Sequence, residues 1–257
     1  TRNLGGRKWE EAMLPVHFES ERPAYATSSS FSRYVRRLIC YAQADVGYTF
    51  AQMIYLCLDP RKVYQLTTYR KQTKNHWARD DPAFVVVLIL FLVVASFSYG
   101  IALRVHGLGF LRILGFFVGL HFLLQGAIIA TLSWFVSKKY LRVQSFHGVE
   151  QRMEWMYAFD VHCNSFFPLF LVLYVVHYLF LPFLVQQTLA AVVVSNLLYA
   201  VALCYYSYIT LLGYSMLPFL RGTEVFLYPS AVALVVLVVL SMLRVNLTRL
   251  SLMSLGV

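Results

Sequence analysis

The stretch AFVVVLILFLVVASFSYGIAL, residues 83–103, decides the fold of this chain. It contains no Lys, Arg, Asp or Glu. An α-helix of this length, rising about 1.5 Å per residue, can cross the roughly 30 Å hydrocarbon core of a membrane. A helix of equal length on the surface of a soluble protein would carry polar residues along one face. The sequence therefore predicts that residues 83–103 form a transmembrane helix.

Four further apolar runs without a charged residue follow it: Ile113–Val136, Phe166–Val185, Thr188–Leu212 and Tyr228–Leu243. The last run is short of a full span and needs Leu227 and Val245–Leu247 to complete it. Composition agrees, because 59% of the residues are hydrophobic and 13% are charged, with a mean hydropathy of +0.62. We predict an all-α polytopic membrane protein with five transmembrane helices in residues 83–257. Ahead of them we expect a flexible N-terminal segment, 1–32, and a cytosolic amphipathic helix with a juxtamembrane segment, 33–82.

The basic residues predict the topology. Residues 1–82 contain 13 of the 22 Lys and Arg residues. The loop after the second span contains four more, and the connection after the fourth span contains Arg221. With five spans, these three segments lie on the same side of the membrane. That side receives 18 basic residues and the opposite side four, so the positive-inside rule puts the N-terminus in the cytosol and the C-terminus in the lumen. Asn246-Leu247-Thr248 is a glycosylation sequon on the lumenal side. We expect it to lie too close to the bilayer for modification.

The net charge of +10 is explained by the same asymmetry. The basic residues cluster beside the spans, which favours attraction to anionic membrane lipids over nucleic-acid binding. The four cysteines show neither a metal-ligand spacing nor a disulfide framework, and no cofactor is predicted. No signal peptide is visible in the first 80 residues, so we expect the first span to act as the insertion signal.

Residues 33–57 have the pattern of an amphipathic helix. At 100° per residue, one face collects Val35, Leu38, Ile39, Ala42, Val46, Phe50, Met53 and Cys57, with three arginines at its start. Asp59-Pro60 should end the helix, since the residue before a proline avoids the helical region. The helix either packs on the cytosolic ends of the spans or lies in the membrane interface, and the two interpretations are compatible.

Residues 60–82 form a polar juxtamembrane segment that contains Arg70, Lys71, Lys74 and Arg79. Tyr69 and Trp77 suit the headgroup layer. Asp80-Asp81-Pro82 can cap the first span, and Arg70 and Arg79 can pair with these carboxylates. Capping and anchoring is one interpretation of the segment, and a surface that binds a partner or lipid headgroups is the other.

Asp160 and His162 precede the third span, in the second cytosolic loop. An enzyme would use them as an acid/base or metal pair, completed by His121 and His177 inside the spans. No second motif with metal-ligand or paired-carboxylate spacing supports this, so a structural network is favoured. A transporter or channel would instead need a polar path lined by His121, Gln125, His177, Ser195 and Asn196.

Several motifs carry a family resemblance. They are YRKQTK at 69–74, WARDDPAF at 77–84, YAFDVH at 157–162, LGYS at 212–215 and LPFL at 217–220. In this order they closely resemble the uncoordinated-fifty (UNC-fifty) family of Golgi membrane proteins, from about Arg33 to about Leu243. Residues 1–32 match nothing in that family, and Cys163 stands where an apolar residue is expected.

The resemblance implies a five-span protein of the Golgi and early secretory pathway, similar in layout to Yip-type proteins. The family is linked to membrane recruitment of large Arf guanine-nucleotide exchange factors and to receptor trafficking, and no catalytic activity is established for it. We therefore expect a non-enzymatic adaptor for vesicle-mediated transport. Its candidate partner-binding residues are Arg70, Lys71, Lys74, Trp77, Arg79, Asp160 and His162.

Overall fold

The computed structural model describes residues 46–74, 76–79, 82–143 and 153–255, and these form a bundle of helices. Five helices within them are long and apolar enough to cross a membrane, which confirms the predicted fold class. They are Ala83–Ala102, Leu108–Leu141, Trp155–Leu179, Leu189–Ser215 and Thr223–Met242. The N-terminal segment 1–32 and the first part of the expected amphipathic helix, 33–45, lie outside the described residues.

The first span is the single helix α5, Ala83–Ala102, and the fourth is α11, Leu189–Ser215, where the Thr188 hydroxyl caps the N–H of Ala191. The second and third spans change helical pitch along their length. The second consists of α6 (Leu108–Leu114), a π-helical segment (Gly115–Leu124), α7 (Gln125–Val136) and a π-helical turn (Ser137–Leu141). The third consists of α8 (Trp155–Phe170), a π-helical segment (Leu171–Val176) and α9 (His177–Leu179). The short helix α10, Leu181–Leu184, follows it.

The third span begins eleven residues earlier than the sequence indicates, at Trp155 instead of Phe166. The prediction that Asp160 and His162 lie in a loop is therefore wrong, because both belong to the first turns of α8. A search for long runs without charged residues cannot find this start, because Asp160 lies within the helix. Its charge is neutralised by a residue that is distant in the sequence. The third span is also the centre of the bundle, with 72% of its most apolar window buried.

The fifth span is extended at its beginning and not at its end. A 3-10 turn, Thr223–Leu227, leads into α12, Tyr228–Met242. Arg244 then adopts a positive φ of 56°, and the chain turns back into α13, Leu247–Leu255. The prediction that Val245–Leu247 complete the span is therefore wrong. Because the fifth span packs along α11 on one side, only 6% of its most apolar window is buried inside the protein.

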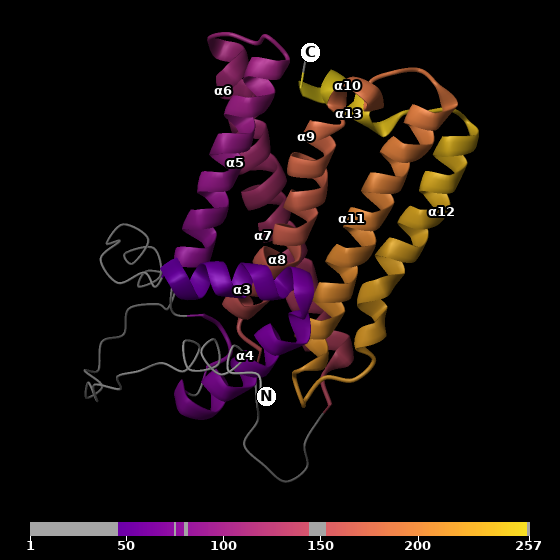
Figure 1. Ribbon diagram of the computed structural model, residues 1–257. Helices are drawn as coiled ribbons and strands as arrows, with labels where there is room; N and C mark the ends of the chain where they lie inside the picture. The colour runs from indigo at the N-terminus through magenta and orange to yellow at the C-terminus, as the bar shows by residue number, and fades with distance from the viewer. Residues whose placement is uncertain (1–45, 75, 80–81, 144–152, 256–257) are drawn as a thin grey trace, which may run out of the picture.

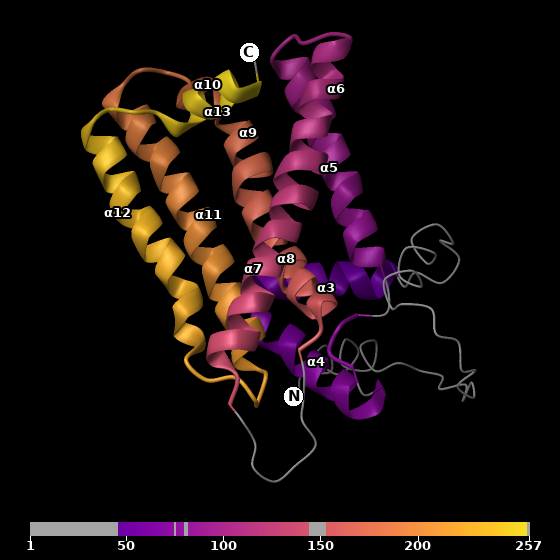
Figure 2. The ribbon, with the colours of Figure 1, turned by 180° about the vertical axis from the view of Figure 1, so that it is seen from behind.

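Two further helices lie at one end of the bundle. α3, Val46–Leu58, runs across the ends of the spans, and α4, Pro60–Lys74, lies beyond it (Figures 1 and 2). The predicted stop before Pro60 is confirmed, since α3 ends at Leu58. A helix over 60–74 was not predicted, because its many polar residues give no apolar face long enough to detect.

The end of span two, the start of span three and the connection between spans four and five also lie at this end, which we call the α4 end. The turn between spans one and two, α10 and α13 lie at the other end. The described basic residues follow the predicted division: Arg104, Arg112, Arg244 and Arg249 belong to the second end, and the remainder to the α4 end. Assignment of the α4 end to the cytosol stays a prediction from this charge asymmetry.

Candidate functional site

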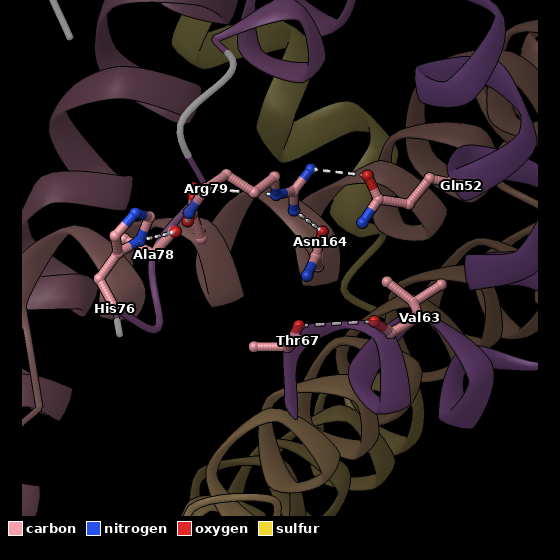
Figure 3. Close-up of polar contacts among 8 residues, drawn as sticks. Gln52, Val63, Thr67, His76, Ala78, Arg79 and Asn164 are labelled. Carbon is pink, nitrogen blue, oxygen red and sulfur yellow. Dashed lines mark hydrogen bonds and ion pairs between the residues drawn. The ribbon is translucent and has the colours of Figure 1, made fainter. Parts of the chain in front are cut away.

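The polar residues singled out in the sequence meet around Arg79, which follows α4 and precedes the first span. Its guanidinium is buried, and Nη1 donates to Oε1 of Gln52 at 3.1 Å while Nη2 donates to Oδ1 of Asn164 (Figure 3). Nε lies 4.0 Å from a carboxylate oxygen of Asp160, and the Arg79 backbone N–H donates to the other oxygen at 2.6 Å. The guanidinium carbon stands 4.3 Å from the centre of the Phe84 ring. We call these residues the Arg79 cluster: Gln52, Arg79, Phe84, Asp160 and Asn164.

The sequence builds this cluster through helix periodicity. Asp160 and Asn164 are four residues apart on α8, so both project from the same face toward Arg79. Gln52 reaches the guanidinium from α3. A buried guanidinium is strongly unfavourable unless it is paired and hydrogen-bonded, and here a carboxylate and two amides surround it. The cluster therefore fixes α3, the segment after α4 and the third span in one arrangement.

Tyr64 extends the buried polar region into α4. Its side chain is 1% exposed and lies beside Asn164 and Gly213. Burial raises the pKa of the Tyr64 hydroxyl far above its ordinary value, so the side chain is neutral at any physiological pH. Any side-chain methyl on Gly213 would meet Val161 and the Tyr64 ring, so a glycine here lets α4 approach α11 closely.

Trp77 is buried as well. Its ring packs edge-on to Tyr157 at 6.3 Å between centroids and lies 6.1 Å from Phe219. Its backbone N–H donates to Glu154 at 3.4 Å, and the Lys71 ammonium lies 5.6 Å from the ring centre. With 3% of its surface exposed, Trp77 does not face lipid headgroups as the sequence suggested. It locks the chain between α4 and the first span against the ends of spans three and four.

The seven candidate partner-binding residues therefore divide into two groups. Arg70, Lys71 and Lys74 lie on α4, where Lys71 is partly exposed; the side chains of Arg70 and Lys74 are outside the described part. The other four, Trp77, Arg79, Asp160 and His162, are buried. Trp77, Arg79 and Asp160 hold the chain that follows α4, and His162 packs between spans two and four, so these four side chains do not themselves form a surface. Asp80 and Asp81, the predicted cap, lie outside the described residues, and helix α5 begins directly after Pro82.

Asp160 and His162 do not form an acid/base pair. Two residues apart on a helix point to opposite sides, so Asp160 faces Arg79 while His162 faces spans two and four. The Nδ1 atom of His162 lies 2.8 Å from the Tyr206 hydroxyl, and its ring stacks 5.9 Å from Phe122. Within the described ranges, no group of three or more His, Cys, Asp and Glu side chains is placed to hold a metal ion.

The polar residues proposed for a transport path also separate. His121 contacts the Tyr174 hydroxyl at 2.6 Å, while Gln125 is exposed on the outside of the second span. His177 and Ser195 converge on the hydroxyl of Thr248, at 2.8 and 2.7 Å. Asn196 donates to Ser241 and to the carbonyl of Val245. The contacts of His177, Ser195 and Asn196 attach α13 and the turn before it to the spans, whereas His121 and Gln125 belong to other parts of the bundle.

Asn246 of the sequon belongs to the same attachment. Its side chain is 8% exposed, donates to the carbonyl of Leu184 at 2.7 Å and accepts from the N–H of Thr248 at 2.9 Å. It acts as the N-terminal cap of α13. A glycan on this nitrogen would require the attachment to open, so the structure gives a further reason to expect no modification.

Sequence reasoning missed Gln52, Tyr64, Asn164 and Tyr206, which complete the buried polar network. One signal was present for Asn164, because its spacing from Asp160 matches one helical turn once residues 155–165 are placed in a helix. Gln52 and Tyr206 belong to elements distant in sequence, and no local pattern links them to Arg79 or His162.

Comparison with known proteins gives a consistent result. The model of the UNC-50 family matches residues 34–255. The Protein unc-50 homolog of Dictyostelium discoideum is 46% identical over 251 residues, which cover 92% of this chain and 95% of that protein. The human Protein unc-50 homolog is 42% identical over 200 residues, covering 77% and 76%, and homolog A of Xenopus laevis is 42% identical over 211 residues, covering 82% and 80%. No solved structure matches the chain.

Proposed function

Because this chain belongs to the UNC-50 family, we propose that it is a non-enzymatic adaptor of the Golgi membrane that helps to recruit a large Arf guanine-nucleotide exchange factor. The proposal places the docking surface on the outer side of α4, at the end of the bundle that the charge asymmetry assigns to the cytosol. The expected role in vesicle-mediated protein transport follows from that recruitment.

The observation that carries this proposal is a polar helix held by buried contacts at one end of the bundle of spans. One side of α4 is buried, through Val63, Tyr64 and Thr67. Its opposite side exposes Arg61, Lys62, Gln65, Tyr69, Gln72 and Thr73. A fixed row of cationic and polar side chains with one exposed tyrosine is suited to steering and orienting a protein that carries an acidic surface.

The buried residues support this role indirectly. The Arg79 cluster and Trp77 fix both the end of α4 and the chain that leads into the first span. A docking helix that is already ordered loses less conformational entropy when a partner binds. The buried charges thus supply pre-organisation, while the exposed charges of α4 supply recognition.

The experiment replaces the exposed cations of the outer side of α4, Arg61 and Lys62, by Glu and measures the exchange factor on Golgi membranes at matched protein level. The control variant replaces the exposed Lys138 and Lys139 by Glu, which gives the same change in net charge at the same end of the bundle. We expect the α4 variant to lose most of its recruitment and the control to retain it. Full recruitment by the α4 variant, at normal abundance and location, would contradict the proposal. Equal loss in both variants would show that general charge, and not α4, is responsible.

A further inference from the structure

Helix α3 has its polar and apolar sides reversed relative to a helix that packs on a protein and faces water. The side chains turned inward are Thr49, Gln52, Met53 and Leu56, of which two are polar. The side chains turned outward are Phe50, Ile54 and Leu58, which are 43%, 57% and 78% exposed. The face predicted from the sequence, through Phe50, Met53 and Cys57, is therefore rotated, and Phe50 lies on the outer side.

The inner side of α3 is held by specific contacts. Gln52 accepts a hydrogen bond from the Arg79 guanidinium, while Met53 and Leu56 are almost fully buried. At the end of the helix, the Tyr205 hydroxyl contacts the carbonyl oxygens of Leu56 and Cys57 at 3.0 and 3.1 Å. These carbonyls have no partner within the helix, so Tyr205 satisfies groups that a helix end leaves free. The orientation of α3 about its own axis is fixed by polar contacts and not by burial of its most apolar side chains.

The depth of α3 follows from its contact with the first span. The ring of Phe50 lies 6.1 Å from that of Phe91. Phe91 is eight residues beyond the start of α5 at Ala83, which corresponds to about 12 Å along the helix axis. Beside it, Leu90 and Val94 are 58% and 57% exposed on the lipid-facing side of the span. The outer side of α3 therefore lies next to a surface that contacts lipid.

The charges of the segment support the same placement. α3 contains no Lys, Arg, Asp or Glu, whereas Asp59, Arg61 and Lys62 follow it at once. The chain thus changes from an uncharged helix lying across the bundle to a charged helix beyond it (Figure 1). Apolar side chains are unfavourable in water and favourable in the boundary between headgroups and acyl chains, where interfacial helices lie with one face buried about 5–10 Å.

We propose that α3 is an interfacial membrane helix, whose outer face contacts the acyl chains of the leaflet at the α4 end. The occupant of this face is lipid and not a protein partner, because the face is continuous with the lipid-facing side of the first span. Lipid on one side and the Arg79 cluster on the other hold the helix parallel to the membrane. This position of α3 places the start of α4 at the depth of the lipid headgroups. The inference does not depend on the proposed recruitment of an exchange factor.

The experiment introduces the photoreactive residue p-benzoylphenylalanine at Ile54 of the full-length protein in nanodiscs of palmitoyl-oleoyl phosphatidylcholine. Irradiation is followed by mass spectrometry of the modified peptide. Position Val94 on the first span is the matched control for lipid contact, and Gln65 on the outer side of α4 is the matched control for water. We expect phospholipid adducts at position 54 at a yield similar to position 94 and several-fold above position 65.

A second photoreactive variant at Leu58 guards against a local disturbance at Ile54, since Leu58 is the most exposed of the three outer side chains. Lipid adducts at either site, in protein that elutes as a single species, support the position of α3 in the membrane interface. Adducts to another protein chain at both sites would show that the face is a protein interface. A yield no higher than at Gln65 at both sites would show that it faces water. Either result overturns the proposal.

Discussion

The carboxylate of Asp160 contacts Arg79 twice, once at the backbone N–H and once at the side chain. One oxygen accepts the N–H at 2.6 Å, and the other lies 4.0 Å from Nε. The two residues are 81 positions apart in the sequence, and both side chains are more than 90% buried. Because a single carboxylate holds both the backbone and the guanidinium, it fixes where the chain enters the first span as well as the charge that lies there.

Removing one partner of this pair should strongly destabilise the protein. Asp160→Ala leaves a buried guanidinium and a buried N–H without their carboxylate, and we expect a loss of about 3–5 kcal/mol in the free energy of unfolding. Arg79→Ala combined with Asp160→Ala should cost less than the sum of the single variants. Unfolding in mixed detergent micelles measures each value.

A matched control is the exposed pair of Lys62 and Asp59, 3.7 Å apart with side chains 55% and 43% exposed. Asp59→Ala should cost less than about 1 kcal/mol, because water screens this pair. If Asp160→Ala cost no more than Asp59→Ala, the Arg79 cluster would not have the structural importance assigned to it.

Gly126 lies directly against the imidazole of His162, so that an added methyl group would overlap the ring. Gly126→Ala should therefore force spans two and three apart or displace His162, with a loss of about 1–3 kcal/mol in stability. Gly119, in the same span, has open space around the corresponding position, and Gly119→Ala is the control, expected to be neutral or slightly stabilising. Adding His162→Ala should recover stability in the Gly126→Ala protein by making room. Thermal unfolding of these three variants and the unmodified protein checks this, and an unchanged midpoint for Gly126→Ala would contradict the close packing.

Thr248 links α13 to two spans through one hydroxyl, which is completely buried. Thr248→Val keeps the shape of the side chain and leaves His177 and Ser195 without this partner, so we expect a loss of about 1–3 kcal/mol. We also expect faster amide hydrogen exchange in residues 247–255 than in the unmodified protein. Ser254→Ala, at an exposed serine of the same helix, should leave both quantities unchanged. Equal exchange in the Thr248→Val and Ser254→Ala proteins would show that the hydroxyl does not hold α13.

Topology can be tested with trypsin on sealed Golgi vesicles. The connection between spans two and three contains Arg142 and Arg152, and the positive-inside rule places it outside the vesicle. We expect cleavage at this connection and protection of a tag at Val257. Detergent should expose the tag and serves as the control. Protection of the connection in sealed vesicles would reverse the predicted orientation.

The sequence by itself determined the number of spans and the class of fold. The length of an apolar run and the absence of charges within it are local properties, and the thickness of the membrane converts them directly into a count of five helices. The family could be recognised from the sequence for a related reason, because motifs such as WARDDPAF are short and contiguous. The start of the third span could not be predicted from the sequence, because it contains the charged Asp160, which only a distant arginine neutralises.

Only the tertiary structure decided what the polar residues do. Periodicity indicated that residues 33–57 form a helix with an apolar face, but in α3, Val46–Leu58, Thr49 and Gln52 turned inward, where Arg79 supplies a polar partner for Gln52. Asp160 and His162 are neighbours in sequence, yet α8 directs one toward Arg79 and the other toward Tyr206. The reason is physical: burial along a helix follows from its own sequence, whereas the partner of a buried polar group depends on which faces of distant helices meet.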